Sequence, residues 1–528
     1  MASPEMVAAM QQPKFYPHRA RKVELIQTHI SYVFIAGNYV YKVKKELNLG
    51  FLDFTTLEKR QYYCRKELEL NRRLAPDIYL EVVAISCDQE GRFLLGTGRE
   101  IVEFAVKMRK LPESGMLKRL LDAGKIDLDF MSSLARKIAA FHREAATGGE
   151  IDLMGSPKTI MRNHEENFLQ VTPFINVTIP QHQFDFIKAY AINFIKKNMA
   201  LFRKRIAAGR IRDCHGDLHL EHICLLKKTI VIYDCIEFNE RFRYEDVAAE
   251  VAFLAMDLDD NGYSDHAEAF VKAYIINSGD GDVAAILNFY KCYYAYVRGK
   301  VISFELNDRD ISESEHKSAL TRASHYFNLA YTYASRLERP ALIIMTGFMG
   351  TGKSVLANSL ASLLGADIIS SDLTRKKMSK VEPTARHYEA FGKGIYVKDI
   401  SLETYRKLRE LAAERIKAGK SVIIDASFKN RRERMAAFET ARALAVDFFV
   451  LECTCPEETI KKRLEQRQAD AAEISDGRWE IFAAQQADFD KITEFPAPLH
   501  LVIDTSQDRE TCLVKAIRHV KNMAAAEK

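Results

Sequence analysis

The second half of the chain alternates short apolar runs with longer segments in which apolar residues recur every three or four positions. The first pattern is typical of buried strands and the second of amphipathic helices. Strands that alternate with helices predict an α/β domain with a doubly wound parallel sheet and helices on both faces. The predicted strands are 341–345, 367–370, 421–425, 447–452 and 499–504.

The first half shows a different order of elements, typical of an α+β domain. Two β-rich runs, 32–35 and 39–45, flank Gly37-Asn38 and predict a hairpin. Thr55 and Glu58 have capping-box spacing, so we expect a helix to begin there and to end near Leu74. The remaining expected segments are a loosely packed start at 1–28, strands at 79–85, 101–107 and 229–233, and helical stretches at 112–210 and 239–338.

The length of 528 residues exceeds the usual limit of one hydrophobic core, so we expect two domains. Pro340 directly precedes the first apolar run of the second half and marks the expected boundary. Within the halves, Ser312, three residues before Glu315, and Ser401 mark the expected starts of two further helices. The expected domains are 1–339, with lobes at about 25–110 and 111–339, and 340–528.

Residues 347–354 read Gly-Phe-Met-Gly-Thr-Gly-Lys-Ser and fit the P-loop pattern G-x-x-x-x-G-K-[ST]. Glycines let successive backbone N–H groups face one anion, and the following helix presents its free N–H groups and positive dipole end. Lys353 can reach the β- and γ-phosphates, and Ser354 can place its hydroxyl on Mg²⁺. A glycine-rich turn without a ligand is the alternative. The pattern predicts that ATP and Mg²⁺ are bound by Gly347, Gly350, Thr351, Gly352, Lys353 and Ser354.

Two aspartates and an arginine follow other strands of this half. Asp425 ends the run 421–425, and Asp372 and Arg375 follow the run 367–370. Ligands bind at the carboxyl ends of parallel strands, where these residues fall. With the P-loop, Asp372-x-x-Arg375 resembles the small kinases that phosphorylate hydroxyl groups: polynucleotide 5′-kinase, gluconate kinase, chloramphenicol phosphotransferase and zeta toxin. The resemblance implies that Asp372 accepts the hydroxyl proton, Arg375 positions the acceptor and Asp425 binds metal, with a helix N-cap as the alternative role of Asp372.

Arg463 and Arg467 form an i, i+4 pair after the fourth predicted strand, where the same kinases have a lid. Lid arginines neutralise charge on the phosphoryl group during transfer. A solvated helix face with Glu465 nearby is the alternative. Arg478 is a further lid candidate.

In the first half, the segment His215-Gly216-Asp217-Leu218-His219 is followed by a predicted strand that ends in Asp234. This segment resembles the catalytic loop of the aminoglycoside phosphotransferase family, a branch of the protein-kinase-like fold, and the order hairpin, helix, strands is that of a kinase N-lobe. The resemblance implies that Asp217 is the catalytic base and that Asp234 binds metal. It also implies that Lys42 contacts the phosphates and that Glu67 is its ion-pair partner. Strand alternation places Lys44 on the same face as Lys42 and leaves the choice between the two lysines open.

His222 departs from the family pattern, which usually has an asparagine metal ligand five residues after the catalytic aspartate. Histidine is a poor match for Mg²⁺, which prefers oxygen ligands. A preference for Mn²⁺, a site with one metal ion, and a loss of catalysis that leaves a nucleotide-binding pseudokinase are the three alternatives. We name His222 as a candidate metal ligand at this position.

Composition changes this picture little. The 77 basic and 72 acidic residues give a net charge of +5, too small an excess to indicate nucleic-acid binding by itself. The nine cysteines form no paired metal-site pattern and indicate reduced thiols and a cytoplasmic location. The N-terminus has no apolar signal segment. The sequence contains no run of about 18 apolar residues, so we expect no membrane span.

We therefore expect an ATP-dependent phosphotransferase, bifunctional, that acts on hydroxyl groups of small molecules. A polynucleotide 5′-hydroxyl kinase is one alternative. It requires a basic channel or stacking aromatic residues near the acceptor site, for which the sequence offers Lys376, Lys377, Lys380, Tyr388 and Phe391. A regulatory protein that senses nucleotide through an inactive N-terminal domain is the other. The sequence names neither phosphate acceptor.

Overall fold

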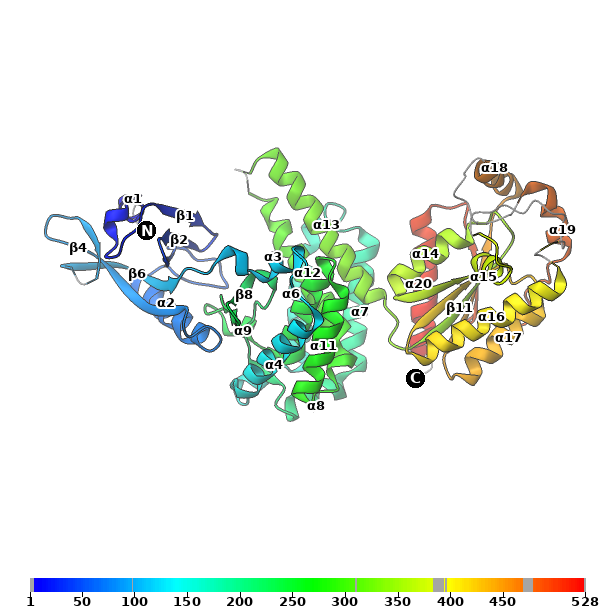
Figure 1. The fold of residues 1–528 in the computed structure, drawn as a ribbon, viewed down its shortest axis with the longest axis horizontal. Coiled ribbons are helices and arrows are strands. Elements are labelled where there is room, and N and C mark those ends of the chain that lie inside the picture. Colours follow the sequence, from blue (N-terminus) through cyan, green and yellow to red (C-terminus); the bar gives the residue numbers. More distant parts are fainter. Residues whose placement is uncertain are drawn as a thin grey trace. The chain divides into compact units, whose positions relative to one another are not determined.

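The computed structural model describes residues 4–96, 98–308, 311–382, 394, 397–468 and 478–526. The chain forms two compact units, Met1–Ala330 and Tyr331–Lys528, which are described separately (Figure 1). This division falls inside helix α13 (Glu313–Ser335), before the boundary expected at Pro340. Tyr388 and Phe391, which the nucleic-acid alternative invokes, lie outside the described residues.

The N-terminal unit begins with an antiparallel sheet of six strands in the order β1-β2-β3-β6-β4-β5. The hairpin predicted around Gly37-Asn38 is confirmed, because β2 pairs with β3 from Ser31↔Lys44 to Ala36↔Tyr39. Helix α2 (Leu57–Arg72) packs against this sheet. The strands are β1 (Val23–Gln27), β2 (Ser31–Ala36), β3 (Tyr39–Lys44), β4 (Tyr79–Cys87), β5 (Phe93–Leu95) and β6 (Glu100–Arg109).

Two expectations for this lobe are wrong. Residues 1–28 are not loosely packed, because helix α1 (Pro4–Met10) buries Met6 and Met10 in a core cluster on the sheet and β1 pairs with β2. The cap of α2 is Thr56 rather than Thr55, and its side chain accepts the N–H of Lys59. The hydroxyl of Thr55 instead donates to Asp53, at 2.6 Å, which removes it from the helix end.

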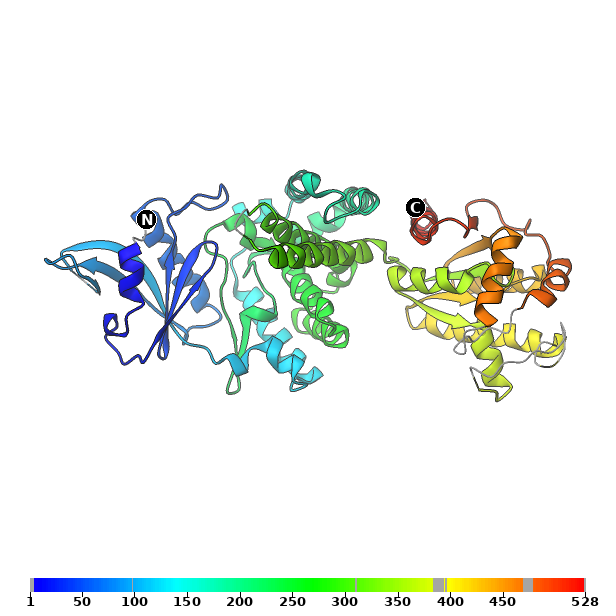
Figure 2. The ribbon, with the colours of Figure 1, turned by 90° about the horizontal axis from the view of Figure 1, so that it is seen from above.

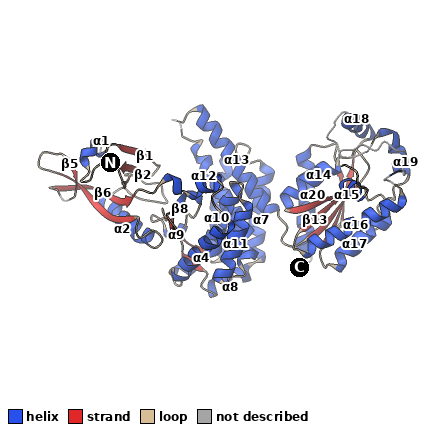
Figure 3. Ribbon diagram, viewed as in Figure 1, coloured by secondary structure: helices blue, strands red, loops and turns tan. Residues whose placement is uncertain are grey.

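The rest of the unit is a helical lobe with two small antiparallel sheets of two strands each, β7 with β10 and β8 with β9 (Figures 1 and 3). The capping box predicted at Ser312 is confirmed. The N–H of Ser312 donates to Oε2 of Glu315 (2.8 Å), and the N–H of Glu315 donates to Oγ of Ser312 (3.3 Å). The helices before α13 are α3 (Leu117–Asp122), α4 (Leu128–Glu144), α5 (Glu150–Met154), α6 (Pro157–Val171), α7 (Gln181–Lys197), α8 (Met199–Ala207), α9 (Glu240–Arg243), α10 (Val247–Asp260), α11 (Ser264–Ser278) and α12 (Val283–Glu305). The short strands are β7 (Ile211–Asp213), β8 (Ile223–Leu226), β9 (Thr229–Ile232) and β10 (Tyr244–Asp246).

The C-terminal unit contains the five predicted strands in one parallel sheet of order β12-β13-β11-β14-β15. Helices α14 and α20 cover one face, and α16 and α17 cover the other (Figure 2). The strands are β11 (Ala341–Thr346), β12 (Ala366–Ser370), β13 (Ser421–Asp425), β14 (Asp447–Thr454) and β15 (His500–Asp504). The helices are α14 (Lys353–Leu364), α15 (Ser371–Met378), α16 (Lys398–Lys417), α17 (Arg431–Ala443), α18 (Glu457–Gln468), α19 (Phe482–Ala487) and α20 (Arg509–Ala526).

One helix start differs from the expectation for this unit. Helix α16 begins at Lys398 after Val397, so Ser401 lies within its first turn, where its N–H already donates to the carbonyl of Val397 at 3.0 Å. The expectation relied on a side-chain cap, and this helix begins without one. In the described part of the chain, no helix is both long enough and apolar enough to cross a lipid bilayer.

Candidate active sites

The N-terminal site begins with two lysines on β3 that share one carboxylate. Lys42 Nζ lies 3.0 Å from Oε1 of Glu67, and Lys44 Nζ lies 2.7 Å from Oε2 of the same residue. Lys42 also lies 2.6 Å from Oδ1 of Asp234, whereas Lys44 contacts Glu237. Burial would lower the pKa of Lys42, but the charges of Asp234, Glu67 and Glu237 outweigh it and hold this pKa well above its usual value. Lys42 is therefore the lysine that reaches the carboxylate expected to bind metal.

Asp217 lies on the loop after β7, and Asp234 follows β9. His222 stands between them: its Nδ1 lies 3.5 Å from Asp217 Oδ2, and its Nε2 lies 3.6 Å from Asp234 Oδ2. His219 Nε2 lies 3.7 Å from the same oxygen of Asp217. The structure thus brings together the residues that the resemblance assigned to this site. Asp217, His219 and His222 each place a ligand atom within 4.8 Å of the others, and Asp234 adjoins this group through Nε2 of His222.

The two aspartates are held in their ionised forms. Burial would raise the pKa of Asp217, but the hydrogen bond of His219 and the charge of His222 lower it to about 2. For Asp234, the charges of Lys42 and His222 likewise overcome burial and lower the pKa below its usual value. A carboxylate at such a low pKa is a weak base, and it can orient a hydroxyl group and accept its proton as phosphoryl transfer proceeds.

The C-terminal end of α2 supports the loops that carry both aspartates. Asn71 Oδ1 accepts the N–H of Cys235 at 2.8 Å, directly after Asp234. Arg73 donates to the carbonyls of Asp213 (2.8 Å) and Cys214 (2.9 Å), directly before the catalytic loop. Glu67, one helical turn before Asn71, binds the two lysines. Helix α2 and its C-cap residue Arg73 therefore contact the two lysines and the segments next to both aspartates.

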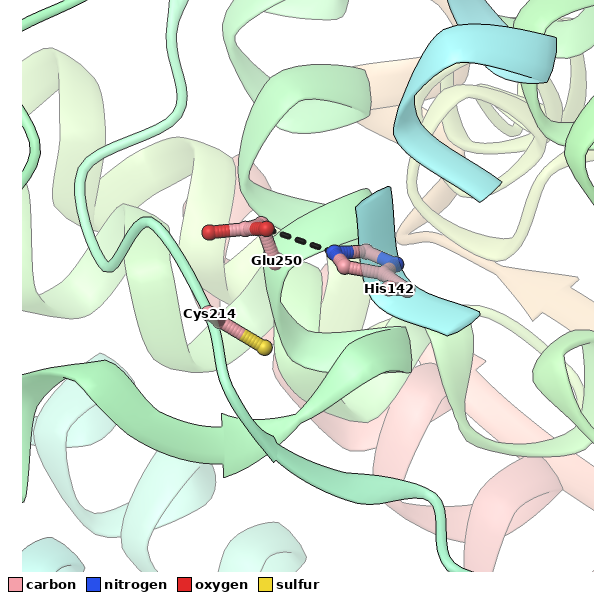
Figure 4. A group of neighbouring side chains, drawn as sticks. All are labelled: His142, Cys214 and Glu250. Atoms are coloured by element: carbon pink, nitrogen blue, oxygen red, sulfur yellow. Dashed lines mark hydrogen bonds and ion pairs between the residues drawn. The ribbon is translucent and has the colours of Figure 1, made fainter. Parts of the chain in front are cut away.

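A buried carboxylate on α10 binds the backbone of the loop that carries Asp217. Oε1 of Glu250 accepts the N–H groups of His215 (2.6 Å) and Gly216 (2.8 Å), and its Oε2 lies 2.6 Å from Nε2 of His142 (Figure 4). Nδ1 of His142 lies 2.7 Å from the hydroxyl of Tyr274. Because buried polar groups are costly unless paired, this chain of hydrogen bonds fixes the loop relative to three helices.

Cys214 completes a group with His142 and Glu250 whose spacing alone would allow a metal ion (Figure 4). Its thiol donates to the carbonyl of Glu245 at 3.7 Å, and burial and nearby carboxylates raise its pKa well above the usual value. A thiol that stays protonated is a poor metal ligand, because the thiolate is the ligating form. The hydrogen bonds above already occupy Glu250 and His142, so we assign this group a structural role.

In the C-terminal unit, the P-loop joins β11 to α14 with glycines in left-handed conformations. Gly347 has φ +128° and lies against the carbonyl of Cys453, where a Cβ atom would collide. Gly350 and Gly352 have φ of +74° and +78°. The side chain of Lys353 donates to the carbonyl of Phe348 at 2.6 Å, within the loop. The backbone shape that the motif predicted is present.

The predicted carboxylates lie around Lys353 and Ser354. The hydroxyl of Ser354 is hydrogen-bonded to Asp425, whose pKa is raised by burial although Ser354 and Lys353 oppose the rise. Burial lowers the pKa of Lys353, against the charges of Asp425 and Asp372. Asp372 pairs with Arg375 (3.2 Å) in the first turns of α15, and the N-cap is Ser370 instead. The structure therefore does not support the alternative that Asp372 serves only as a helix cap.

The two predicted lid arginines lie on α18 and differ in surroundings. Arg463 donates to the hydroxyl (3.2 Å) and carbonyl (2.7 Å) of Thr505, after β15. Thr505 in turn donates to the carbonyl of Thr351 in the P-loop at 2.7 Å. The charge of Arg467 acts on both Lys353 and Asp425. Both arginines are thus tied to the P-loop side of the unit rather than to an independent solvated face.

Sequence reasoning missed three groups at these sites. Glu250 is a lone acid within the otherwise apolar stretch 247–256, and that isolation was an available signal. The spacing of Glu237 after Asp234 in the sequence matches no known motif, and its contact with Lys44 depends on the fold. Thr505 lies far from the P-loop in sequence, so its hydrogen bonds had no sequence signal.

The fold and the sites define the class: a protein-kinase-like unit joined to a P-loop unit. A family model described as an AAA domain matches residues 342–492. Among solved structures, a gluconokinase from Sinorhizobium meliloti is 16% identical and has a TM-score of 0.27 over 35% of this chain and 94% of its own. The amicoumacin kinase hAmiN, solved with AMP-PNP, Ca²⁺ and Ami, is 12% identical and has a TM-score of 0.39 over 62% of this chain and 94% of its own.

Relatives along almost the whole chain show the family. The uncharacterized protein Rv2004c of Mycobacterium tuberculosis and the uncharacterized protein Mb2027c of Mycobacterium bovis are each 30% identical over 473 residues. The match covers 89% of this chain and 91% of each relative. The chain belongs to the family of these mycobacterial proteins.

Proposed function

We propose that the protein is a bifunctional phosphotransferase that transfers the γ-phosphate of ATP to hydroxyl groups of small molecules, with one acceptor site in each unit. The observation that carries this proposal is that each unit gathers a lysine and carboxylates at one place. Lys42 lies 2.6 Å from Asp234, which His222 links to Asp217. The charges of Asp425 and Asp372 act on Lys353 in the second unit.

In the N-terminal site, Lys42 holds the phosphates while Glu67 fixes its position. Asp217 orients the acceptor hydroxyl and takes its proton as the oxygen–phosphorus bond forms. The support from Glu250 keeps the Asp217 loop in place without reorganisation during the reaction.

The donor set of this site fits one divalent cation held by Asp234 and His222. A bound ion neutralises charge on the phosphates. The imidazole favours Mn²⁺ over Mg²⁺, because Mg²⁺ prefers oxygen ligands. Lys42 already occupies Oδ1 of Asp234, and this leaves Oδ2 for the metal ion.

In the C-terminal site, the N–H groups of the P-loop and Lys353 bind the phosphates. Ser354 and Asp425 fit a Mg²⁺ ion, since both offer oxygen donors and are already hydrogen-bonded to each other. Asp372 orients the acceptor, with Arg375 beside it. Arg463 and Arg467 stabilise the charge on the phosphoryl group.

A small acceptor is favoured over a nucleic-acid end. Of the three lysines that would contribute to a basic channel, Lys376 is only 1% exposed and cannot contact a bound strand directly. Lys377 and Lys380 remain on the surface. Two exposed lysines are a weak electrostatic footprint for a nucleic acid.

The test is ATP turnover with a panel of acceptors on wild type, Lys353→Ala and Asp217→Ala. The panel contains aminoglycosides, sugars, sugar acids, nucleosides and 5′-hydroxyl oligonucleotides. Transfer that Asp217→Ala abolishes and Lys353→Ala leaves intact would establish an active N-terminal site. If every transfer survives Asp217→Ala and is lost in Lys353→Ala, the N-terminal unit is a nucleotide-sensing domain and the bifunctional proposal is wrong. Phosphorylation of oligonucleotides alone would favour the repair enzyme.

A further inference from the structure

A small cavity lies in the helical lobe of the N-terminal unit, away from the nucleotide-binding residues. Its volume is about 50 Å³, several times the roughly 10–15 Å³ that one water molecule requires. It opens between α4, β7 and α11. The polar side chains that line it are Arg143, Arg210, Arg212, His142, Tyr274 and Ser278.

The three arginines give the cavity a positive charge that the described residues do not balance. Within the described part of the chain, no carboxylate lies within 4 Å of the guanidinium groups of Arg143 or Arg212. Arg210 has one acidic neighbour, Asp280, at 3.5 Å. Asp280 is already bound by Arg205 through two hydrogen bonds of 3.0 and 2.9 Å. Three arginines therefore face a cavity with one shared carboxylate.

Backbone carbonyls hold Arg212 in place at the cavity wall. Its Nε donates to Gly209 O (2.9 Å), and its NH1 group donates to the carbonyls of Arg143 (3.0 Å) and Ala145 (2.7 Å). A guanidinium fixed in this way is preorganised, so less side-chain entropy is lost when it binds a ligand. These contacts use Nε and NH1 of Arg212, and its NH2 group remains to donate to an oxyanion.

The opposite wall is polar and buried. His142 and Tyr274 are 3% and 0% exposed and are hydrogen-bonded to each other at 2.7 Å. Ser278 adds a hydroxyl at the end of α11. Both ring nitrogens of His142 are already hydrogen-bonded, to Tyr274 and Glu250, so the arginines are the groups of this cavity that offer donors to an oxyanion.

We propose that this cavity is a binding site for a phosphate group, either inorganic phosphate or the phosphoryl end of a phosphomonoester. The volume excludes a whole nucleotide. The site is separate from both candidate active sites and does not rest on the proposed phosphotransferase activity. It shares His142 with the hydrogen-bond chain that supports the catalytic loop (Figure 4), so a bound phosphate lies one residue away from Glu250.

The test is isothermal titration of inorganic phosphate into the full chain saturated with Mg²⁺ and AMP-PNP. Saturation is needed because a P-loop binds phosphate itself. Wild type is expected to bind phosphate, and Arg212→Gln and Arg143→Gln each weaken binding by at least about tenfold, as loss of a charge-assisted hydrogen bond predicts. Arg143→Lys is expected to restore part of the affinity.

The control is Arg203→Gln, which removes the same charge from an exposed position on α8 that does not line the cavity. Melting temperatures show whether each variant is folded, and Arg143→Gln is informative even if Arg212→Gln unfolds, because Arg143 is exposed. A parallel titration with glucose 6-phosphate distinguishes the two sources of phosphate. The proposal is wrong if wild type binds neither probe, if Arg143→Gln binds as wild type does, or if Arg203→Gln weakens binding equally.

Discussion

Nε2 of His222 lies 3.6 Å from Oδ2 of Asp234. The aminoglycoside phosphotransferase pattern, which the sequence resembles, has an asparagine at the position of His222. This relationship predicts metal selectivity. In a Lys353→Ala background, His222→Asn should raise the ratio of Mg²⁺-supported to Mn²⁺-supported kcat/KM about tenfold, because an amide oxygen replaces a nitrogen donor. Metal titrations of acceptor phosphorylation measure this ratio. An unchanged ratio would show that His222 does not contact the metal ion.

Substitution of Glu250 is expected to reduce the activity of the N-terminal site, although Glu250 does not belong to the residues expected to bind substrate. Glu250→Ala leaves the N–H groups of His215 and Gly216 without their acceptor. We expect the free energy of unfolding of this unit to fall by about 4 kcal/mol, because two buried N–H groups and the ring of His142 lose their hydrogen-bond partner.

Glu250→Gln serves as the informative variant if the alanine variant unfolds. It keeps an oxygen acceptor and should retain the fold while kcat of the N-terminal site falls more than KM rises. Glu144→Ala, an exposed acid at the end of α4, is the matched control. Equal losses of transfer in both units would contradict this assignment, since Glu250 supports one loop only.

The two lysines that share Glu67 are expected to fail in different ways. Lys42→Met should abolish phosphate transfer in the N-terminal site with a smaller loss of stability than Lys44→Met, because Lys44 still pairs with the buried Glu67 and the side chain of Asp234 is 40% exposed. Lys44→Met should destabilise the unit by about 4 kcal/mol, because it leaves the buried carboxylate Glu237 without its contacting cation and Glu67 with Lys42 alone. Denaturant unfolding and ATP titration separate the two effects. The opposite result would assign the phosphate lysine to Lys44.

His164 predicts a pH dependence of stability. Burial among Phe168, Phe289 and Tyr293 lowers the pKa of His164 to about 3. In the unfolded chain its pKa is about 6.5, so the unfolded state binds a proton first as pH falls. The stability it contributes is complete above pH 6.5 and declines from there toward pH 3. Between pH 7.5 and 5 this single group should cost about 2 kcal/mol.

Unfolding of wild type and His164→Phe at the two pH values measures the effect. The phenylalanine variant should lose less stability between them, because it carries no titrating group among the same aromatic neighbours. His182→Phe is the control for removing a histidine of α7. Identical pH dependence in wild type and His164→Phe would mean that other groups determine the loss.

The extent of prediction from sequence differed between the two units for a physical reason. The P-loop, Asp425 and Asp372 were found because local backbone shape and strand ends fix their positions. Lys42 and Glu67 were found through the resemblance, but strand alternation could not separate Lys42 from Lys44. The separation comes from Asp234, which contacts only Lys42 of the two lysines and lies far along the chain.

Contacts between distant segments explain what remained hidden. Glu250 acts on a loop that precedes it by more than thirty residues, and its side chain direction depends on helix packing. The start of the chain appeared loose because Met6 and Met10 are too few to show a period, yet they complete the core on the sheet. Capping residues were placed to within a few positions, because several hydroxyl side chains near a helix start compete for the same N–H groups.

Helix α2 has a mechanical consequence for the N-terminal site. Glu67 in its last two turns contacts Lys42, Asn71 accepts the N–H that follows Asp234, and the C-cap residue Arg73 donates to the carbonyls that precede the loop of Asp217. A helix is stiff along its axis, so a sliding movement of α2 would displace all three attachments at once. Lys42 and the segments that carry Asp217 and Asp234 would then shift together, so the geometry of the N-terminal site depends on the position of this one helix.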